Sequence, residues 1–431
     1  MMSLAQIVAA QGSTVAGSDR SLDQGRSGAK FERIAAQGIG LFAQDGSGIV
    51  SADQIVVASA AIEATVPDIV RATELGCARM TRAELLAELF NAAPIGIAVG
   101  GTSGKSTVTG MIGWILDQVG RDPTIMNGAI MKNYGTGARV GRGEVFVSEV
   151  DESDGSIALY RPTVAVLNNV AVDHKSLEDL RALFSEFLAR ADKSVVNADN
   201  AEAASLATPT LTFGLASLSD LRAIDLVERP DGVEFRVGDT HVALALPGRH
   251  NASNALAALG AAAMVGVPVS AAAAALSTFS GLNRRMEVVG TANTITVIDD
   301  FGHNPDKIAA TLSALHVFPG RLLVFFQPHG YGPLKQMGRE LAYAFRANLD
   351  EGDRLIVNDP AYFGGTVDRS IGSEALVEAI GDQAEHIASR EACGERLLSL
   401  ARPHDRIVVM GARDDTLSDF AAGLLAALPS A

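Results

Sequence analysis

Short apolar runs rich in β-branched residues alternate with longer, alanine-rich stretches along most of the chain. A short apolar run bounded by turn residues is typical of a buried strand, and the longer stretches carry apolar residues at helical spacing. Alternation of strand and helix predicts an α/β fold in which helices cover largely parallel sheets. In the first half of the chain, strands are expected at residues 54–60, 95–101, 144–150, 163–169 and 193–199.

Helices are expected between these strands and after them, at residues 103–120, 176–191 and 252–267. Between residues 222 and 246 the pattern changes to short runs in which apolar and polar residues alternate, as they do in antiparallel hairpins. The α/β pattern then returns. Its later strands are expected at residues 294–301, 321–329, 353–360 and 405–412, each followed by a helical stretch.

The length of 431 residues exceeds what one hydrophobic core usually holds, so several domains are expected. We place one boundary near residue 90, before the glycine-rich end of a strand, and another near residue 283, after the sequence FSGLN. The predicted domains are therefore residues 1–90, 91–283 and 284–431.

Composition narrows the class of protein. Apolar residues make up 48% of the chain and charged residues 20%, as in globular proteins. The net charge of −15 is spread along the chain, which disfavours non-specific binding to nucleic acid or anionic membranes. Cys77 and Cys393 are too few and too distant to suggest a disulfide framework or a metal site. Because no apolar stretch could span a bilayer and no basic segment precedes the apolar start, we expect a cytoplasmic protein.

The sequence VGGTSGKSTVTG, at residues 99–110, joins a predicted strand to a predicted helix. It differs from the usual phosphate loop, which has glycine where Val99 stands. Backbone N–H groups at a helix N-terminus, with glycines that allow close approach, nevertheless favour a bound anion. In a nucleotide site Lys105 would contact the terminal phosphates and the Ser106 hydroxyl would bind Mg²⁺. The alternative is a tight turn whose lysine is solvated.

Further motifs favour the nucleotide site. The shorter loop, Gly-Thr-x-Gly-Lys-Ser/Thr-Ser/Thr, resembles the phosphate loop of the Mur ligase family. Its residues here are Gly101, Thr102, Ser103, Gly104, Lys105, Ser106 and Thr107. Other stretches resemble that family in the same order: SEVDESDGS, LNNVAVDH, LPGRHNASNA, LNRRMEVVG, DDFGHNPDKI, FFQPHGY and VVMGA. The resemblance covers nearly the whole chain.

The resemblance implies a three-domain architecture, in which Rossmann-like N- and C-terminal domains flank a phosphate-loop ATPase domain. It implies an ADP-forming ligase that uses ATP and Mg²⁺ to convert a carboxylate into an acyl phosphate, which an amine then attacks. The motifs are most similar to those of members that join L-alanine to UDP-N-acetylmuramic acid in peptidoglycan synthesis. The partners would be these small molecules rather than nucleic acid or a membrane, and the chain would act as a monomer or homodimer.

Two alternatives stay open because the chain departs from the alanine-adding pattern. It could be a sibling ligase that adds another amino acid or a murein tripeptide, or a non-catalytic member that binds ATP. Gly330 and Pro333 stand where the alanine-adding members carry arginines, and Lys335 is the nearest replacement cation. Ser103 and Ser176 also replace a histidine and an acidic residue of the family pattern. A dehydrogenase is a weaker rival, since no complete Gly-x-Gly-x-x-Gly follows a first strand.

For the phosphates, the resemblance implies that Glu149 holds Mg²⁺ opposite Ser106 and that His174 binds a second Mg²⁺ near the attacking carboxylate. Taken alone, a histidine after a strand is more often structural than a ligand. Arg285 is expected to neutralise the γ-phosphate, because arginine suits bidentate phosphate contact, and Arg284 is its less favoured neighbour.

For the nucleoside, the resemblance implies that His250, Asn251 and Asn254 contact adenine and that Asp300 holds the ribose. His303 would face the reaction centre or the amino acid. Two plainer interpretations accompany these roles. Asn251 could be a helix N-cap, and the sequence DDFGHNP could be a strand end followed by a turn.

For the carboxylate substrate and the amino acid, we expect contacts from Glu152, Ser153, Asn169 and His329. Some acids of the DESD turn would only cap the helix that follows. The first strand and glycine-rich uridine loop of the family are missing, so either the true start lies upstream or the uridine site is reduced. Asp19 ends a predicted strand, where a Rossmann-like fold commonly has a ribose-binding acid.

Overall fold

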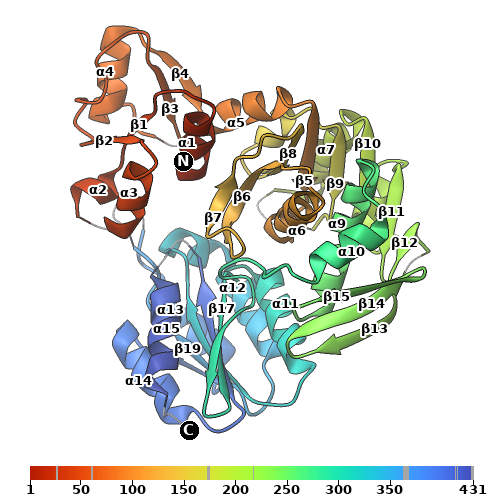
Figure 1. The fold of residues 1–431 in the computed structure, drawn as a ribbon. Coiled ribbons are helices and arrows are strands. Elements are labelled where there is room, and N and C mark those ends of the chain that lie inside the picture. Colours follow the sequence, from red (N-terminus) through yellow and green to blue (C-terminus); the bar gives the residue numbers. More distant parts are fainter. Residues whose placement is uncertain are drawn as a thin grey trace. The chain divides into compact units, whose positions relative to one another are not determined.

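The computed structural model describes residues 1–25, 28–59, 62–171, 175–216, 218–362, 368–412, 414 and 416–428. Its contacts divide the chain into two compact units, whose elements are labelled in Figure 1. The first unit comprises Met1–Asp225, Phe235–Val242 and Ser253–Phe279, and the second comprises Leu226–Glu234, Ala243–Ala252 and Ser280–Ala431. The first unit contains most of the predicted N-terminal and central domains, and the boundaries at residues 90 and 283 stay predictions.

The N-terminal part of the first unit contains two small parallel sheets. β1 (Ala16–Ser18) pairs with β2 (Gly40–Phe42), and β3 (Ile55–Ala58) pairs with β4 (Ala78–Thr81). The helices of this part are α1 (Met2–Ala10), α2 (Arg20–Asp23), α3 (Gly28–Ala35), α4 (Pro67–Leu75) and α5 (Arg82–Asn91). Helix α5 begins with a capping box, in which Thr81 and Glu84 each accept from the other's backbone N–H.

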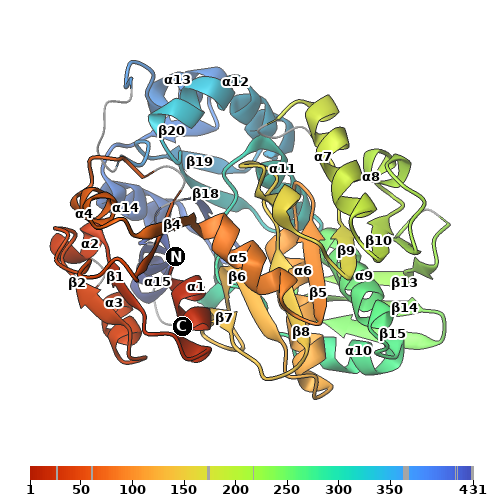
Figure 2. The same cartoon turned by 90° about the horizontal axis from the view of Figure 1, so that it is seen from above.

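An eight-stranded sheet forms the centre of the first unit, and Figure 2 shows it with helix α6 beside it. Its order is β12-β11-β10-β9-β5-β8-β6-β7, and all neighbours are parallel except β6 and β7. The strands are β5 (Ile95–Gly100), β6 (Thr124–Met131), β7 (Thr136–Arg139), β8 (Val145–Glu149), β9 (Val164–Leu167), β10 (Lys193–Asn197), β11 (Leu211–Gly214) and β12 (Leu221–Arg222). Because β5 lies between β8 and β9, the carboxyl ends of these three strands meet at one edge of the sheet.

Helices bury the faces of this sheet. α6 (Lys105–Gln118) packs against β5, β6 and β8, and Phe184 and Phe187 of α7 (Leu177–Ala189) are fully buried in the core. The remaining helices here are the 3₁₀ turn Ser156–Leu159, α8 (Ala201–Ser205), α9 (Arg249–Met264) and α10 (Val269–Leu276). The short strands predicted between residues 222 and 246 are present as β13 (Ile224–Arg229), β14 (Gly232–Val237) and β15 (Thr240–Leu244), which form a separate sheet in that order.

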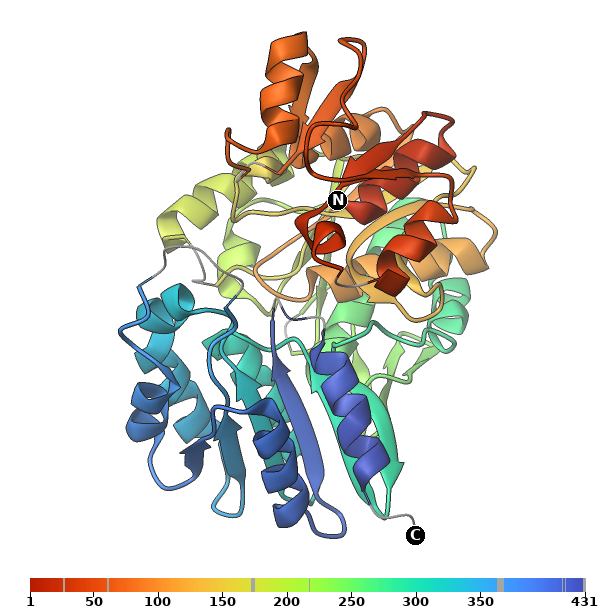
Figure 3. The same cartoon turned by 90° about the vertical axis from the view of Figure 1, so that its left-hand side faces the viewer.

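The second unit is built on a six-stranded sheet of order β16-β17-β21-β18-β19-β20, seen in Figure 3. Its strands are β16 (Glu287–Ala292), β17 (Ile295–Asp300), β18 (Leu322–Gln327), β19 (Arg354–Val357), β20 (Ala384–His386) and β21 (Arg406–Gly411). Only β16 is antiparallel to its neighbour. The helices are α11 (Pro305–His316), α12 (Tyr331–Asn348), α13 (Ser373–Ile380), α14 (Arg390–Leu400) and α15 (Leu417–Ala427).

Alternate residues of β18 belong to different hydrophobic cores. Val324 and Phe326 pack in one core with α11, α12 and α13, whereas Leu323 and Phe325 pack in the other with α14 and α15. Successive side chains of a strand point to opposite faces, so both faces of this sheet are covered by helices. The second unit is therefore a doubly wound α/β fold, which explains why its strands read as continuous apolar runs. Among the described helices, none is long and apolar enough to cross a membrane.

Candidate nucleotide and substrate site

The predicted phosphate loop is a turn between β5 and α6. Gly101 and Gly104 have φ angles of 132° and 82°, which side chains with a Cβ rarely adopt, so both positions favour glycine. Helix α6 begins at Lys105, which directs the first N–H groups of the helix and its positive dipole end toward the loop. This strand–turn–helix geometry is that of an anion cradle. The strand, turn and helix predicted for residues 95–120 are confirmed.

Lys105 is bound to groups of the protein itself. Its Nζ donates to the Gly101 carbonyl oxygen at 2.7 Å and to Glu152 Oε2 at 2.7 Å. The Glu152 side chain is almost completely buried, with 6% exposure, and that of Lys105 has 19%. A buried carboxylate beside the loop therefore neutralises the cation that would otherwise meet phosphate.

Ser106 and Glu149 meet at the other side of the loop. The Ser106 hydroxyl donates to Glu149 Oε2 at 2.7 Å, and Glu149 ends β8, the strand next to β5. The carboxylate also lies against Gly128 of β6, where an added Cβ would overlap Glu149 Oε1. A hydroxyl and a carboxylate are hard oxygen ligands, and Mg²⁺ commonly takes one or two such protein groups together with substrate phosphates. These two residues therefore fit the Mg²⁺ role predicted for them.

Three asparagines hold the loop in place: Asn168 and Asn169 follow β9, and Asn127 lies in β6. Asn169 Oδ1 accepts from the Ser103 N–H and the Thr102 hydroxyl, each at 2.8 Å, and its Nδ2 donates to the Ser103 carbonyl at 3.0 Å. Asn168 donates to the same carbonyl at 3.0 Å, and Asn127 Nδ2 donates to the Ser106 carbonyl at 2.9 Å. Asn169 therefore supports the loop in this structure, and its substrate role stays a prediction.

The acid-rich turn after β8 divides into two kinds of residue. Glu152 binds Lys105, whereas Ser153 donates its N–H and hydroxyl to Asp151 Oδ1 at 2.8 and 2.6 Å. Burial alone would raise the pKa of Asp151, but these bonds and the charge of Lys105 hold it below its ordinary value. Asp154 Oδ1 accepts from the Ser156 N–H at 2.8 Å, whereas the N-cap of the 3₁₀ turn that begins at Ser156 is Gly155. The substrate roles of Glu152 and Ser153 stay predictions.

His174 lies outside the described residues, so the second Mg²⁺ site stays a prediction from sequence. Ser176, which replaces an acidic residue of the family pattern, is the N-cap of α7. Its hydroxyl accepts from the Asp179 N–H at 3.1 Å. The departure from the family at this position thus has a structural role at a helix start.

Helix α9 carries the residues predicted to contact adenine. It begins at Arg249, so His250 is its second residue, and Asn251 and Asn254 are one turn apart. Asn251 Nδ2 donates to the Pro247 carbonyl at 2.8 Å, whereas an N-cap side chain would accept from a backbone N–H. Asn251 therefore makes a different bond from the one that the N-cap interpretation expects. Asn254 Oδ1 accepts from Asn168 at 3.0 Å.

In the second unit, the two adjacent arginines differ in their surroundings. The Arg284 guanidinium is buried and bonds to Asp299 Oδ1 at 3.2 Å, the Gly411 carbonyl at 2.8 Å and the Asp414 carbonyl at 3.0 Å. Both guanidinium groups also lie over the Phe301 ring, that of Arg284 at 5.2 Å and that of Arg285 at 4.8 Å from its centroid. Arg284 is thus a structural residue. The choice of Arg285 as the phosphate ligand stays a prediction.

Asp300 is buried at the end of β17. Its carboxylate accepts from the N–H groups of Met286 at 2.9 Å and Gly302 at 2.8 Å, and from the Thr311 hydroxyl at 3.0 Å. These bonds support the strand-end interpretation of DDFGHNP, and Asn304 begins α11 as its N-cap. A ribose contact by Asp300 stays a prediction.

His303 and His329 lie side by side at the ends of β17 and β18, with ring centroids 4.9 Å apart. His303 Nδ1 is 2.8 Å from the Phe301 carbonyl, which can only accept, so Nδ1 carries the hydrogen. Burial lowers the pKa of His303 to about 3, and the positive charge of Lys307 acts in the same direction. His303 is therefore neutral near pH 7, with the lone pair on Nε2.

Lys335, the cation nearest in sequence to positions 330 and 333, pairs with Asp368 Oδ2 at 2.7 Å, and both side chains are about half exposed.

An arginine that was not predicted lies at the carboxyl ends of the sheet in the second unit. Arg390, the first residue of α14, forms an ion pair with Asp414 and donates to Gln327 Oε1 at 2.6 Å. Burial alone would raise the pKa of Asp414, but bonds from Thr416, Gln327 and Arg390 lower it to about 2.

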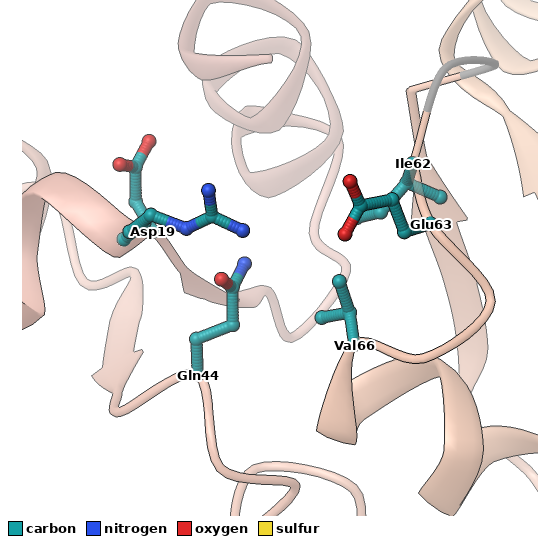
Figure 4. A pocket seen from close by; sticks show the side chains of 6 residues that line it. Asp19, Gln44, Ile62, Glu63 and Val66 are labelled. Carbon is teal, nitrogen blue, oxygen red and sulfur yellow. The ribbon is translucent and has the colours of Figure 1, made fainter. Parts of the chain in front are cut away.

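The N-terminal part holds a cavity of about 370 Å³, shown in Figure 4, lined by Asp19, Arg20, Gln44, Ile62, Glu63 and Val66. Asp19 and Gln44 lie on one side of it, and Glu63 and Val66 on the other. Asp19 directly follows β1, as predicted for a ribose-binding acid, and its carboxylate also caps α2 through the Ser21 N–H at 2.8 Å. The volume suits part of a small organic ligand.

Comparisons with known proteins decide the family. Residues 1–93 match the model "Mur ligase family, catalytic domain", residues 99–262 the "Mur ligase middle domain" and residues 284–413 the "Mur ligase, glutamate ligase domain". A UDP-N-acetylmuramate–L-alanine ligase of Acidithiobacillus ferrooxidans is 38% identical over 89% of this chain and 85% of its own length. One from Sulfurihydrogenibium sp. is 32% identical over 99% and 95%. The chain belongs to the Mur ligase family.

Solved structures agree on the fold of this Mur ligase. The UDP-N-acetylmuramate-alanine ligase of Thermotoga maritima covers 99% of this chain and 95% of its own, with a TM-score of 0.78 and 22% identity. A murein peptide ligase of Psychrobacter arcticus covers 100% and 97%, with a TM-score of 0.71 and 23% identity. At these identities the likeness establishes the fold alone. The predicted fold class and three-domain Mur ligase architecture are confirmed.

Sequence reasoning missed four residues of this Mur ligase that the geometry brings to the sites: Asn127, Gly128, Asn168 and Arg390. The first three surround the phosphate loop, and each comes from a strand or strand end near β5. A search of the polar residues at strand ends would have found Asn168, whereas Asn127 and Gly128 lie in the middle of β6, which the sequence analysis did not predict. Arg390 begins a helix far along the chain, and no local pattern singles it out.

Proposed function

We propose that this ligase joins L-alanine to UDP-N-acetylmuramic acid with conversion of ATP to ADP and phosphate, in peptidoglycan precursor synthesis. The observation that carries the ATP chemistry is the loop geometry, with Lys105 and Ser106 at the start of α6 and Glu149 2.7 Å from the Ser106 hydroxyl. The choice of substrates rests on the names of the relatives that cover most of the chain.

The reaction would proceed in two steps. The carboxylate of the sugar substrate attacks the γ-phosphorus of ATP, which gives an acyl phosphate and ADP. The amino group of alanine then attacks the acyl carbon, phosphate leaves and an amide forms, with loss of a proton from nitrogen. Transfer of a phosphoryl group depends mostly on positioning and on neutralisation of charge. Bound Mg²⁺, held by Ser106 and Glu149, would supply positive charge beside the phosphates.

Lys105 would exchange partners when ATP binds. Its ammonium contacts Glu152 and the Gly101 carbonyl, so the phosphates would replace a carboxylate that lies 2.7 Å away. Glu152 would thus keep the partly buried lysine cation paired until the phosphates take its place. Glu152 would then face the region of the attacking carboxylate, as predicted from the sequence.

The second unit would supply the amino-acid end of the reaction. Neutral His303 carries a lone pair on Nε2, because Nδ1–H faces the Phe301 carbonyl. Such a nitrogen accepts a hydrogen bond from an amine and does not repel an ammonium group. His329, whose ring lies beside it, would share in this contact. Arg285 would neutralise the γ-phosphate.

The test measures phosphate release by purified protein with ATP, Mg²⁺ and UDP-N-acetylmuramic acid against a panel of amino acids and the murein tripeptide. We expect L-alanine to give the highest kcat/KM, and we expect no release when the sugar substrate is omitted. Release with another acceptor only would contradict the alanine assignment and leave the ligase activity standing. Turnover with none of the acceptors would contradict the proposed reaction.

A second candidate function is a sibling ligase that adds another amino acid or a murein tripeptide. The observation that favours it is the absence of arginine at positions 330 and 333, where Gly330 precedes α12 and Pro333 lies in its first turn. The same assay separates the two candidates. Under either proposal the protein works in the cytoplasm as a monomer or homodimer, with small molecules as its partners rather than nucleic acid or a membrane.

A further inference from the structure

Asn168 connects the phosphate loop to helix α9 within the first unit. It is the first residue after β9, and only 4% of it is exposed. Its Nδ2 lies 3.0 Å from the Ser103 carbonyl oxygen and 3.0 Å from Asn254 Oδ1. One buried amide group therefore contacts both the loop and the side chain predicted to read the nucleotide base.

The Ser103 carbonyl determines the orientation of both amides. The oxygen and nitrogen of an asparagine side chain are assigned from the hydrogen-bond network, but a backbone carbonyl can only accept. Asn168 must therefore turn its nitrogen toward Ser103. The same nitrogen faces Asn254, so Asn254 must turn its oxygen toward Asn168, and its own amide nitrogen points away. The orientation of Asn254 thus follows from the loop through Asn168.

The other atom of Asn168 supports this interpretation. Its Oδ1 is buried and has no hydrogen-bond partner among the described residues. A buried acceptor without a partner destabilises the fold, and leucine at this position would avoid that cost. The two N–H donors of Asn168, which bond the Ser103 carbonyl and Asn254 Oδ1, therefore explain why asparagine stands here. The pair also rests directly on the loop, since a Cβ on Gly104 would overlap Asn168 Nδ2 and Asn254 Oδ1.

We propose that Asn168 is a positioning residue for ATP, which orients Asn254 so that the Asn254 amide donates to a ring nitrogen of adenine. The inference rests on the proposed function, which assigns Asn254 to the base. A ring nitrogen of adenine accepts hydrogen bonds, whereas the exocyclic amino group donates them. With its oxygen directed toward Asn168, Asn254 presents its N–H donors to the base, and these donors can bond a ring nitrogen but not the amino group.

The experiment measures the affinity of the full chain for Mg²⁺-ATP and for 1-deaza-, 3-deaza- and 7-deaza-ATP by titration calorimetry. Each analogue replaces one ring nitrogen by C–H. We expect the wild-type protein to bind one analogue about 2- to 12-fold more weakly than ATP, the value of one hydrogen bond. Asn168→Leu should weaken ATP binding and remove that difference. Asn254→Leu should remove the same difference, and the double variant should not reduce it further.

The matched control is Asn197→Ala. Asn197 Nδ2 donates to the Asn168 backbone carbonyl at 2.9 Å, so the variant perturbs the same strand end while leaving both side-chain amides in place. It should retain the preference among the analogues even if its thermal midpoint falls. If Asn168→Leu does not fold, Asn168→Thr, which offers one O–H donor for two acceptors, should show a reduced preference.

The proposal is overturned if wild-type protein binds all three analogues as tightly as ATP, or if the Asn168 variants keep the wild-type preference. Binding is measured without the carboxylate or the amine, so a wrong choice of amino acid leaves this test intact. Absence of ATP binding by wild-type protein would instead contradict the proposed function together with the inference drawn from it.

Discussion

The residues predicted to bind ligands have different partners in the two units. In the first unit, Lys105 bonds to Glu152 and Ser106 bonds to Glu149, so side chains predicted to bind ligands contact one another directly. In the second, Asp300 accepts from backbone N–H groups. A phosphate cradle requires a fixed backbone turn, which a short motif encodes, whereas a pocket for a small amino acid is defined by shape and by residues from distant elements.

The largest expected effect tests the phosphate site. Lys105→Ala should lower ADP formation by about a hundredfold or more, because a preorganised charge aimed at the transferred phosphoryl group is lost. Coupled phosphate and ADP assays measure the loss. Since the change leaves Glu152 buried without its partner at 2.7 Å, the double variant Lys105→Ala, Glu152→Gln should regain thermal stability but not activity.

Lys193→Ala is the matched control for the lysine variants. Lys193 is exposed and its Nζ donates to the Met264 carbonyl at 2.8 Å, away from the loop, so its activity should equal that of wild-type protein. Full ADP formation by Lys105→Ala would contradict the assigned site, and with it the distinction between the two regions.

A glycine variant should give the next largest effect. An added Cβ at Gly128 would overlap Glu149 Oε1, so Gly128→Ala should displace the carboxylate from Ser106 and raise the Mg²⁺ concentration needed for half-maximal rate. We expect kcat/KM to fall about ten- to a hundredfold, as a displacement near 1 Å can cause, with little change in thermal midpoint. Gly423→Ala, where nothing lies within 4 Å of the new Cβ, should leave the rate unchanged. An unaltered Mg²⁺ dependence in Gly128→Ala would argue against Glu149 as a ligand.

The sequence predicted the loop and the strands β5, β8, β9, β10, β17, β18, β19 and β21, because each depends on a local apolar run. It did not predict β6, β7, β11, β12, β16 or β20. The magnesium role of Glu149 was implied by the resemblance and stays a prediction.

The sequence did not predict that Lys105 binds Glu152, since two residues 47 positions apart meet only through the pairing of β5 with β8. It also selected Asn169 and missed Asn168, because adjacent residues at a strand end cannot be told apart without the backbone. Arg390 was missed because its contacts with Gln327 and Asp414 bring together three separate segments of the chain.

A pH series tests the second unit. The pKa of His303 is lowered from 6.5 to about 3, so the unfolded chain binds more protons than the folded one between these values. Stability that is present above pH 6.5 is therefore lost as the pH falls through this window. Relative to His303→Gln, wild-type protein should lose about 2 kcal/mol of unfolding free energy between pH 7 and pH 5, measured by urea denaturation.

His241→Gln is the control for replacement of a histidine by glutamine, because His241 is exposed on β15. An identical slope in wild-type protein and His303→Gln would show that His303 is not held neutral by burial. The same pair of proteins also tests activity, since a neutral His303 predicts that its titration contributes nothing to the rate profile between pH 6 and pH 8.

The smallest expected effect concerns Lys335. Its Nζ pairs with Asp368 at 2.7 Å, where both side chains are half exposed, and such pairs contribute little to stability. If Lys335 replaced the arginines missing at positions 330 and 333, Lys335→Met would raise the KM for the amino acid at least tenfold. Because its charge is already paired with Asp368, we expect the KM to change less than twofold, with a thermal midpoint within a degree of wild-type protein. Asp368→Asn, which removes the partner of the same lysine, should likewise change the KM for the amino acid less than twofold. A large rise in KM for Lys335→Met alone would instead show that this lysine binds the carboxylate of the amino acid. Lys335 would then resemble Lys105, because each lysine would leave a protein carboxylate to bind its ligand.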